Sequence, residues 1–169
     1  MRLRDVIREK NKTKVTFGPW STEKPKRKDF PLSCKSGWCY PLTRQWRWTT
    51  VHFDIGKTSY TILIAYHLVV PEFSAILAER VSNDSRVIGR LEYHANHAEV
   101  GWHLHANCDE AHIIGVGMVK PLGQLRIPAA RSKHSKGKYT LNGDSMNDNM
   151  ALAIAGDRYR FPYQTSLIV

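Results

Sequence analysis

The chain has 169 residues, 42% of them hydrophobic and 24% charged, which suits one globular domain with a hydrophobic core. No apolar run approaches the ~20 residues that span a bilayer, because the longest, residues 61–70, is interrupted by Tyr66 and His67. The first residues are charged with no apolar stretch behind them, and three cysteines give no disulfide framework. The sequence therefore predicts a cytoplasmic protein without a membrane segment.

Basic residues are concentrated at two flanks of the chain. Residues 1–48 hold 13 Lys and Arg against four acidic residues, and residues 120–140 hold six against none, whereas residues 49–119 are net acidic. Such flanks attract polyanions through counterion release, which predicts a nucleic-acid partner, although a merely solubilising surface is the alternative. The candidate nucleic-acid contacts are Lys24, Lys26, Arg27, Lys28, Arg44, Arg47, Arg131, Lys133, Lys136 and Lys138.

Residues 1–48 form a basic, aromatic-rich N-terminal arm in this interpretation, and residues 49–169 form a single domain. Proline residues interrupt the arm, yet tryptophans are interleaved with its basic residues. Disordered tails are poor in large aromatics. We therefore expect most of these rings to pack on the domain, with base stacking as the alternative.

From residue 49 the pattern is that of β-strands. Residues 51–55 alternate apolar and polar positions, and residues 60–70 are rich in β-branched and aromatic residues, so the two runs predict a hairpin across residues 56–59. Residues 73–81 fit either a helix or a strand, and the turn at Asn83-Asp84-Ser85 favours a second hairpin with residues 87–93. A third hairpin joins residues 90–94 to residues 100–107.

One helix is predicted near the end of the chain. Ser145, with Asp148 three residues later, suggests an N-cap, and Gly156 would end the helix. Residues 161–169 are apolar enough to form a last strand. The predicted fold class is α+β: an antiparallel meandering β-sheet with at least one C-terminal helix and the basic N-terminal arm.

The third hairpin concentrates histidine, because five of the eight histidines fall between residues 94 and 112. Side chains on a strand alternate between faces. The apolar side chains that should face the core are Leu91, Tyr93, Trp102 and Leu104. The polar side chains that should then share the outer face are Arg90, Glu92, His94, His103 and His105.

Three interpretations of this polar face compete. In the first, His94, His103 and His105 ligate zinc, because a His-x-His pair and a third histidine fit a tetrahedral site with one open position. In the second, no metal is needed: two histidines act as general base and general acid, Glu92 orients an imidazole and Arg90 stabilises a phosphoryl transition state. In the third, the face is a polar surface without catalytic function.

The residues Arg90-Leu-Glu-Tyr93-His-Ala-Asn96-His97, followed by His103-Leu-His105, resemble the Tyr-Asp-Asn…His-x-His hairpin of the TumE-like ribonuclease toxins. The resemblance is confined to residues 90–105, and His94 stands where that family has aspartate. It implies RNA cleavage in a toxin–antitoxin setting, with His103 and His105 near the site.

Together these features predict a histidine-dependent endoribonuclease that needs no cofactor and binds RNA in preference to DNA. The candidate catalytic residues are Arg90, Glu92, His94, His103 and His105. Two alternatives stay open: a zinc-dependent hydrolase that uses the three histidines, and a non-catalytic module that binds nucleic acid or protein. A protein partner or inhibitor would fit a toxin or defence factor.

Overall fold

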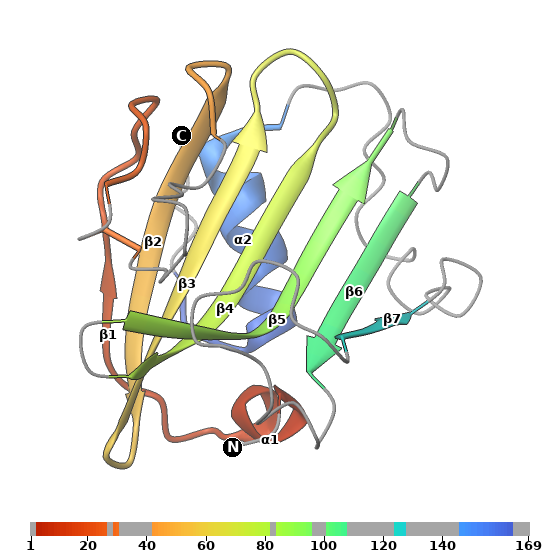
Figure 1. Ribbon diagram of the computed structural model, residues 1–169. Coiled ribbons are helices and arrows are strands. Elements are labelled where there is room, and N and C mark those ends of the chain that lie inside the picture. The colour runs from red at the N-terminus through yellow and green to blue at the C-terminus, as the bar shows by residue number, and fades with distance from the viewer. Residues whose placement is uncertain are drawn as a thin grey trace.

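The computed structural model describes residues 3–26, 29–30, 42–81, 84–95, 101–107, 124–127 and 146–163, with the backbone alone for residues 84, 103–107 and 124–127. Two helices and seven strands lie in this part of the chain (Figure 1). In chain order they are α1 (Leu3–Arg8), β1 (Thr13–Phe17), β2 (Trp46–Ile55), β3 (Thr58–His67), β4 (Phe73–Val81), β5 (Asp84–His94), β6 (Gly101–Asn107), β7 (Gln124–Ile127) and α2 (Asp148–Tyr159).

The strands form one antiparallel sheet in which spatial order follows sequence order from β1 to β7. From β2 to β6 each strand pairs with the next because short connections favour antiparallel neighbours, whereas β1 and β7 are joined to the sheet through longer segments. The two-residue connection between β2 and β3 begins at Gly56, whose φ of 59° suits glycine. The predicted α+β meander with a C-terminal helix is confirmed, and residues 73–81 form a strand.

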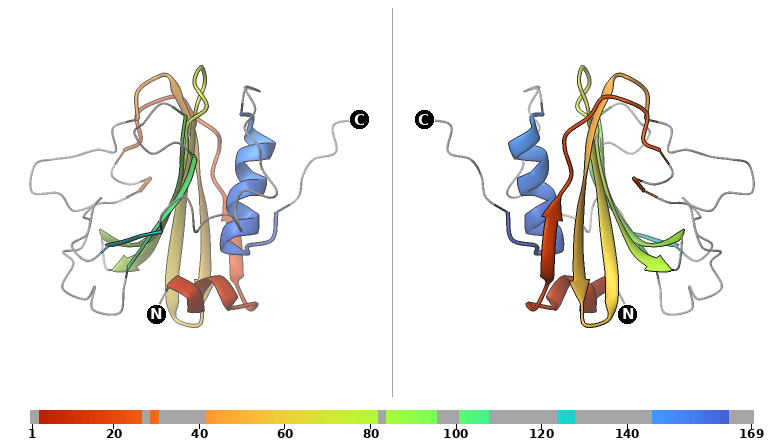
Figure 2. Two further views of the ribbon diagram at one scale, coloured as in Figure 1. Left: turned by 90° about the vertical axis from the view of Figure 1, so that its right-hand side faces the viewer. Right: turned by 90° about the vertical axis from the view of Figure 1, so that its left-hand side faces the viewer.

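Helix α2 covers one face of the sheet, which we call the α2 face (Figure 2). Alternating side chains of the central strands meet the helix there in the main hydrophobic core. Its fully buried members include Phe53, Ile62, Ile64, Phe73, Leu77, Ile154 and Tyr159. Burying such side chains is the main stabilising contribution to the fold.

The opposite face of the sheet carries a second, smaller apolar cluster. Phe30 and Leu42 pack there against Leu63, Ile76 and their neighbours, and all four side chains are buried. The sheet is therefore apolar on both faces at its centre. The run of buried residues in β3, from Tyr60 to Tyr66, follows from this two-sided packing.

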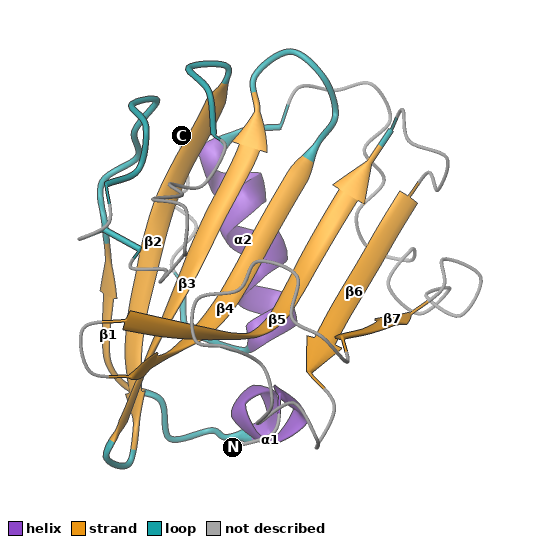
Figure 3. Ribbon diagram, viewed as in Figure 1, coloured by secondary structure: helices purple, strands orange, loops and turns teal. Residues whose placement is uncertain are grey.

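Part of the segment expected to form the N-terminal arm belongs to the sheet and the core. Helix α1 lies near one end of the strands (Figure 3), and its Val6 is fully buried. A Cβ built on Gly89 of β5 would come within 2.7 Å of the Leu3 side chain, so the helix approaches the sheet closely at a residue without a side chain. Strand β2 begins at Trp46, before the expected boundary at residue 49.

Helix α2 corrects two details of the prediction. Its N-cap is Asn147, whose side chain accepts the backbone N–H of Met150, and the predicted cap Ser145 lies outside the described residues. Gly156 does not end the helix, which continues to Tyr159 with Arg160 in the left-handed conformation. The reason is packing: a Cβ at Gly156 would lie 2.1 Å from the Tyr163 ring.

The predicted last strand is also wrong over its described part. Residues 161–163 are not in a strand, and Phe161 is buried beside the helix core. Residues 164–169 lie outside the described residues.

Candidate catalytic site

Three of the predicted catalytic residues form a line on β5, which we call the polar row: Arg90, Glu92 and His94. Alternation along the strand places Leu91 and Tyr93 at the α2-face core and the polar row on the opposite face. The register agrees, because Arg90 pairs with Ile76, a member of the opposite-face cluster. The predicted separation of polar and apolar side chains on this strand is confirmed.

Glu92 is the centre of the polar row. One carboxylate oxygen, Oε2, lies 3.0 Å from Nη2 of Arg90 and 3.6 Å from Nε2 of His94. A carboxylate beside an imidazole can fix the orientation of the ring. The arrangement therefore links a guanidinium, a carboxylate and an imidazole through a single oxygen.

The polar row is not the solvent-exposed outer face that the sequence predicted. The side chains of Arg90 and Glu92 are only 8% and 12% exposed, and that of His94 is 24% exposed. The prediction treated the sheet as covered on one face, whereas Phe30 and Leu42 also bury the other. Exposure increases along β5 toward His94, so the row opens to solvent at that end.

Strand β6 brings two more of the predicted residues to the row. In the register, His103 is directly opposite Glu92 and His105 is directly opposite Arg90. Residues directly opposite in an antiparallel pair have Cβ positions on the same face, about 4.5–5.5 Å apart. The backbone thus brings all five predicted catalytic positions together on one sheet face, although the side chains of His103 and His105 lie outside the described residues.

Ser74 is a residue of this site that sequence reasoning missed. It lies on β4 directly opposite Glu92, and it is 7% exposed. Among the described residues, neither its hydroxyl nor Nε of Arg90 has a hydrogen-bond partner, although both atoms are buried. The serine follows Phe73 in an apolar strand, but only the register shows that it faces the polar row.

The predicted nucleic-acid contacts have separate locations. Lys24 and Lys26 are exposed and line a cavity of about 430 Å³ with Trp48 and His52 at the β2 side of the opposite face. Arg44 is exposed in the turn before β2. The other candidates outside the described residues are Arg27, Lys28, Arg131, Lys133, Lys136 and Lys138.

His52 borders this cavity without joining the polar row. Its Nδ1 lies 3.0 Å from the hydroxyl of Thr61. Burial, and then the charge of Arg80, lower the pKa of His52 below its ordinary value. The imidazole is therefore neutral near neutral pH.

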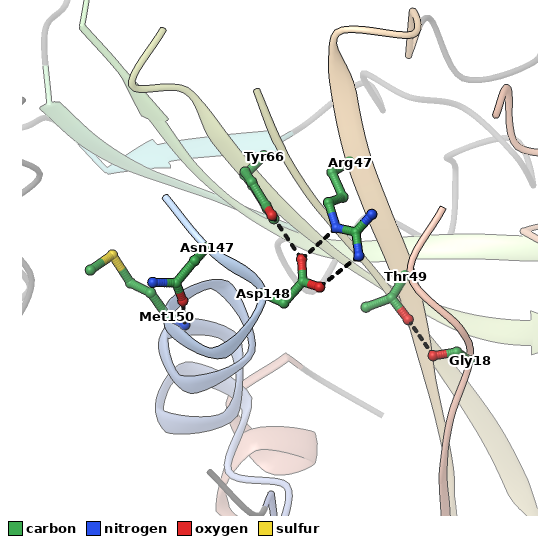
Figure 4. A network of polar contacts seen from close by, with 7 residues as sticks. All are labelled: Gly18, Arg47, Thr49, Tyr66, Asn147, Asp148 and Met150. Carbon is green, nitrogen blue, oxygen red and sulfur yellow. Dashed lines mark hydrogen bonds and ion pairs between the residues drawn. The ribbon is translucent and has the colours of Figure 1, made fainter. Parts of the chain in front are cut away.

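Arg47 is on the α2 face and is engaged within the protein (Figure 4). It donates two hydrogen bonds to Asp148 at the start of α2, from Nε at 2.7 Å and from Nη2 at 2.8 Å, and Tyr66 donates a third at 2.7 Å. Burial opposes ionisation of Asp148, but the hydrogen bonds from Arg47 and Tyr66 outweigh it and lower the pKa of the carboxyl. This network attaches the helix to the sheet, and it engages the guanidinium of Arg47 within the protein.

Within the described ranges, which leave out the side chains of His103 and His105, no three His, Cys, Asp or Glu side chains are grouped as metal ligands would be. No helix in the described part of the chain is long and apolar enough to cross a membrane.

Comparison of the chain with protein-family models, with curated proteins and with solved structures gave no match.

Proposed function

We propose that this protein is a histidine-dependent endoribonuclease whose site is the polar row of β5 together with His103 and His105 of β6. The observation that carries the proposal is the shared contact of Glu92 with Arg90 and His94, on the sheet face where the register places two further histidines. A cationic guanidinium and several imidazoles on one face provide the groups that phosphodiester cleavage requires.

The proposed reaction is an internal transfer at phosphorus. One imidazole removes the proton of the RNA 2′-hydroxyl, and the 2′-oxygen attacks the adjacent phosphorus. The bond from phosphorus to the 5′-oxygen breaks, and a second, protonated imidazole donates its proton to that oxygen. Glu92 orients His94, Arg90 stabilises the charge on the phosphoryl oxygens, and the products are a 2′,3′-cyclic phosphate and a 5′-hydroxyl.

The decisive experiment treats the full chain with EDTA and supplies single-stranded RNA and DNA of the same sequence. We expect the RNA to be cut to 2′,3′-cyclic phosphate ends, with a maximal rate near neutral pH, and the DNA to survive because it lacks the 2′-hydroxyl. His94→Ala should lower the rate by about 10²-fold or more. His67→Ala is the matched control, because His67 is on β3, two strands from β5, and its ring packs edge-on against Trp46 of β2.

The outcomes separate the three classes of function. Loss of cleavage in EDTA with recovery in zinc would identify a zinc-dependent hydrolase that uses His94, His103 and His105. Binding of both nucleic acids without cleavage of either would identify a binding module instead. An equal loss of activity in His94→Ala and His67→Ala would contradict the assigned role of the polar row.

The charged flanks supply the proposed binding to RNA, and salt dependence tests them. Replacing Lys24, Lys26, Arg27 and Lys28 by glutamine should weaken binding and reduce the slope of log affinity against log salt by roughly 0.7 for each lost phosphate contact. Arg4→Gln and Arg8→Gln form a control that removes positive charge from α1. An unchanged slope in the first variant would show that these residues are a solubilising surface.

A further inference from the structure

Two buried polar atoms on the opposite face of the sheet have unused hydrogen-bonding capacity. They are Oγ of Ser74 and Nε of Arg90, and neither has a partner among the residues that the structure describes. About 90% or more of buried polar groups in proteins are hydrogen-bonded, and a buried donor without a partner is destabilising. Two such atoms in neighbouring residues therefore indicate a site that something else completes.

The register places the two residues together. Ser74 is directly opposite Glu92, and Ile76 is directly opposite Arg90, so Ser74 and Arg90 are diagonal neighbours on adjacent strands. Diagonal neighbours have Cα atoms about 7–8 Å apart, a separation that an arginine side chain spans. The two side chains are therefore neighbours on one face of the sheet.

The chemistry of the two groups selects the ligand. Arginine can only donate hydrogen bonds; its Nη2 lies 3.0 Å from Glu92, whereas its buried Nε–H has no acceptor among the described residues. The serine hydroxyl can donate a second bond beside it. Two converging donors, one of them cationic, fit an oxygen that carries negative charge, as in a phosphate group.

The charge balance and the exposure of the row are compatible with an anion. The charge of Glu92 is compensated by Arg90, so the two together do not repel a phosphate. The side chain of His94 is 24% exposed, against 8% for Arg90, so the row is accessible from the His94 end. An incoming phosphate would meet His94 first and the two donors behind it.

We propose that Ser74 and Arg90 form a phosphate subsite, in which Ser74 Oγ–H and Arg90 Nε–H donate to one non-bridging oxygen of the substrate. This inference rests on the proposed ribonuclease function and deepens it, because it adds Ser74 as a residue that contacts the reacting phosphate. The donors are fixed before the substrate arrives, and donors fixed in this way stabilise the charge that develops on phosphoryl oxygens.

The test measures binding of inorganic phosphate to the full chain by isothermal titration calorimetry, with ionic strength balanced by chloride. We expect Ser74→Ala to weaken phosphate binding by about tenfold, as expected for loss of a hydrogen bond to a charged group. The matched control is Thr49→Val, which removes a buried hydroxyl from the α2 face of β2. It should leave phosphate affinity unchanged.

Each outcome supports or overturns the subsite. Weaker binding in Ser74→Ala alone supports it. Equal affinity of wild type and Ser74→Ala, an equal loss in both variants, or no phosphate binding by the wild type overturns it. Melting temperatures of both variants, measured in the same buffer without phosphate, show whether the fold is retained.

RNA cleavage distinguishes failure of the subsite from failure of the ribonuclease proposal. Phosphate binding that depends on Ser74, in a protein that does not cut RNA, would support the subsite and contradict the ribonuclease. RNA cleavage with the same kcat and KM in wild type and Ser74→Ala would support the ribonuclease and contradict the subsite.

Discussion

The two faces of the sheet bury polar groups in different ways. On the α2 face, two sets of polar groups are matched: Tyr159 donates to the carbonyl of Ala75 at 2.8 Å, and Asp148 accepts from Arg47 and Tyr66. Nε of Arg158 in α2 is buried without a partner among the described residues. On the opposite face, Ser74 and Arg90 each bury a polar atom that no described residue satisfies. Matched groups stabilise a fold, whereas unmatched buried groups cost stability and are retained where they serve binding. The comparison therefore associates the matched network of Asp148 with stability and marks the neighbouring pair Ser74 and Arg90 as the candidate for binding.

The largest expected effect concerns the core of the α2 face. Trp102 is 3% exposed and packs against Phe73 and Tyr93, with ring centroids 5.7 and 5.1 Å away. Trp102→Ala should lower the free energy of unfolding by about 3–5 kcal/mol, because it removes a large buried ring and leaves a cavity. Urea denaturation measures this loss.

The adjacent residues of β6 provide the comparison for Trp102. His103→Ala and His105→Ala should each cost less than Trp102→Ala, because the strand alternation places both histidines outside the α2-face core that Trp102 fills. A loss from either histidine as large as that of Trp102→Ala would reverse the assignment of faces or indicate a structural metal.

The second effect concerns the link between α2 and the sheet. Asp148→Asn should cost about 1–2 kcal/mol at pH 7, a value reduced because Asp148 and Arg47 are each about one-third exposed. The pKa of Asp148 is lowered in the folded protein, so its carboxylate stabilises the fold above the unfolded pKa of about 3.9. This contribution is lost as the pH falls through the folded pKa.

The pH dependence of stability tests that assignment. Thermal unfolding of wild type and Asp148→Asn should differ at neutral pH and converge below about pH 4. Asp54→Asn is the control, because Asp54 bonds Ser59 and Lys14 on the surface, and its effect should be small. If the difference for Asp148→Asn persists in strong acid, the amide disturbs packing and the charge is not the cause.

The sheet could be predicted from the sequence because its strands carry local signals. The runs at residues 51–55 and 60–70 are rich in β-branched and aromatic residues, and short connections make the order of strands follow the chain. The predicted start of α2 differs from the observed one because Ser145 and Asn147 are both acceptable caps, and the structure shows that Asn147 accepts the backbone N–H of Met150. The end predicted at Gly156 is wrong because the contact of this residue with Tyr163 is tertiary and has no local signal.

The sequence was enough to predict which residues of β5 share a face, but it did not predict how deeply they are buried. Alternation alone separates Glu92 from Leu91, and this separation is confirmed. Arg90 is buried on the face that carries the second apolar cluster, two of whose members, Phe30 and Leu42, come from a distant segment without periodicity. Ser74 could not be assigned to the site because its role depends on the register of β4 with β5.

The third effect concerns a histidine on the opposite face. Burial, followed by the charge of Arg80, lowers the pKa of His52 in the folded protein. The unfolded chain then binds a proton more readily, so stability is full above the unfolded pKa of about 6.5 and declines as the pH falls toward the folded value. His52→Gln should remove this decline while keeping a hydrogen-bonding group for Thr61. Urea denaturation between pH 8 and pH 5 measures how the free energy of unfolding changes with pH in the wild type and in His52→Gln. An equal decline in the two proteins would show that another group causes the decline.

The smallest expected effect tests the comparison of the two faces most directly. Thr49→Val and Ser74→Ala each remove one buried hydroxyl, but the Thr49 hydroxyl donates to the carbonyl of Gly18 at 2.7 Å, whereas that of Ser74 has no partner among the described residues. Thr49→Val should therefore cost about 1–2 kcal/mol, because it leaves a buried carbonyl unsatisfied.

Ser74→Ala should change the free energy of unfolding by about zero or increase it slightly, because it deletes a buried group that forms no hydrogen bond. Urea denaturation without phosphate compares the two variants, and phosphate added at saturating concentration should stabilise the wild type more than Ser74→Ala. If Ser74→Ala destabilises the protein as much as Thr49→Val does, its hydroxyl is a structural group, and the difference between the two faces does not hold at this position. A neutral or stabilising result, combined with a smaller stabilisation by phosphate, identifies Ser74 as a group whose burial lowers stability in exchange for binding.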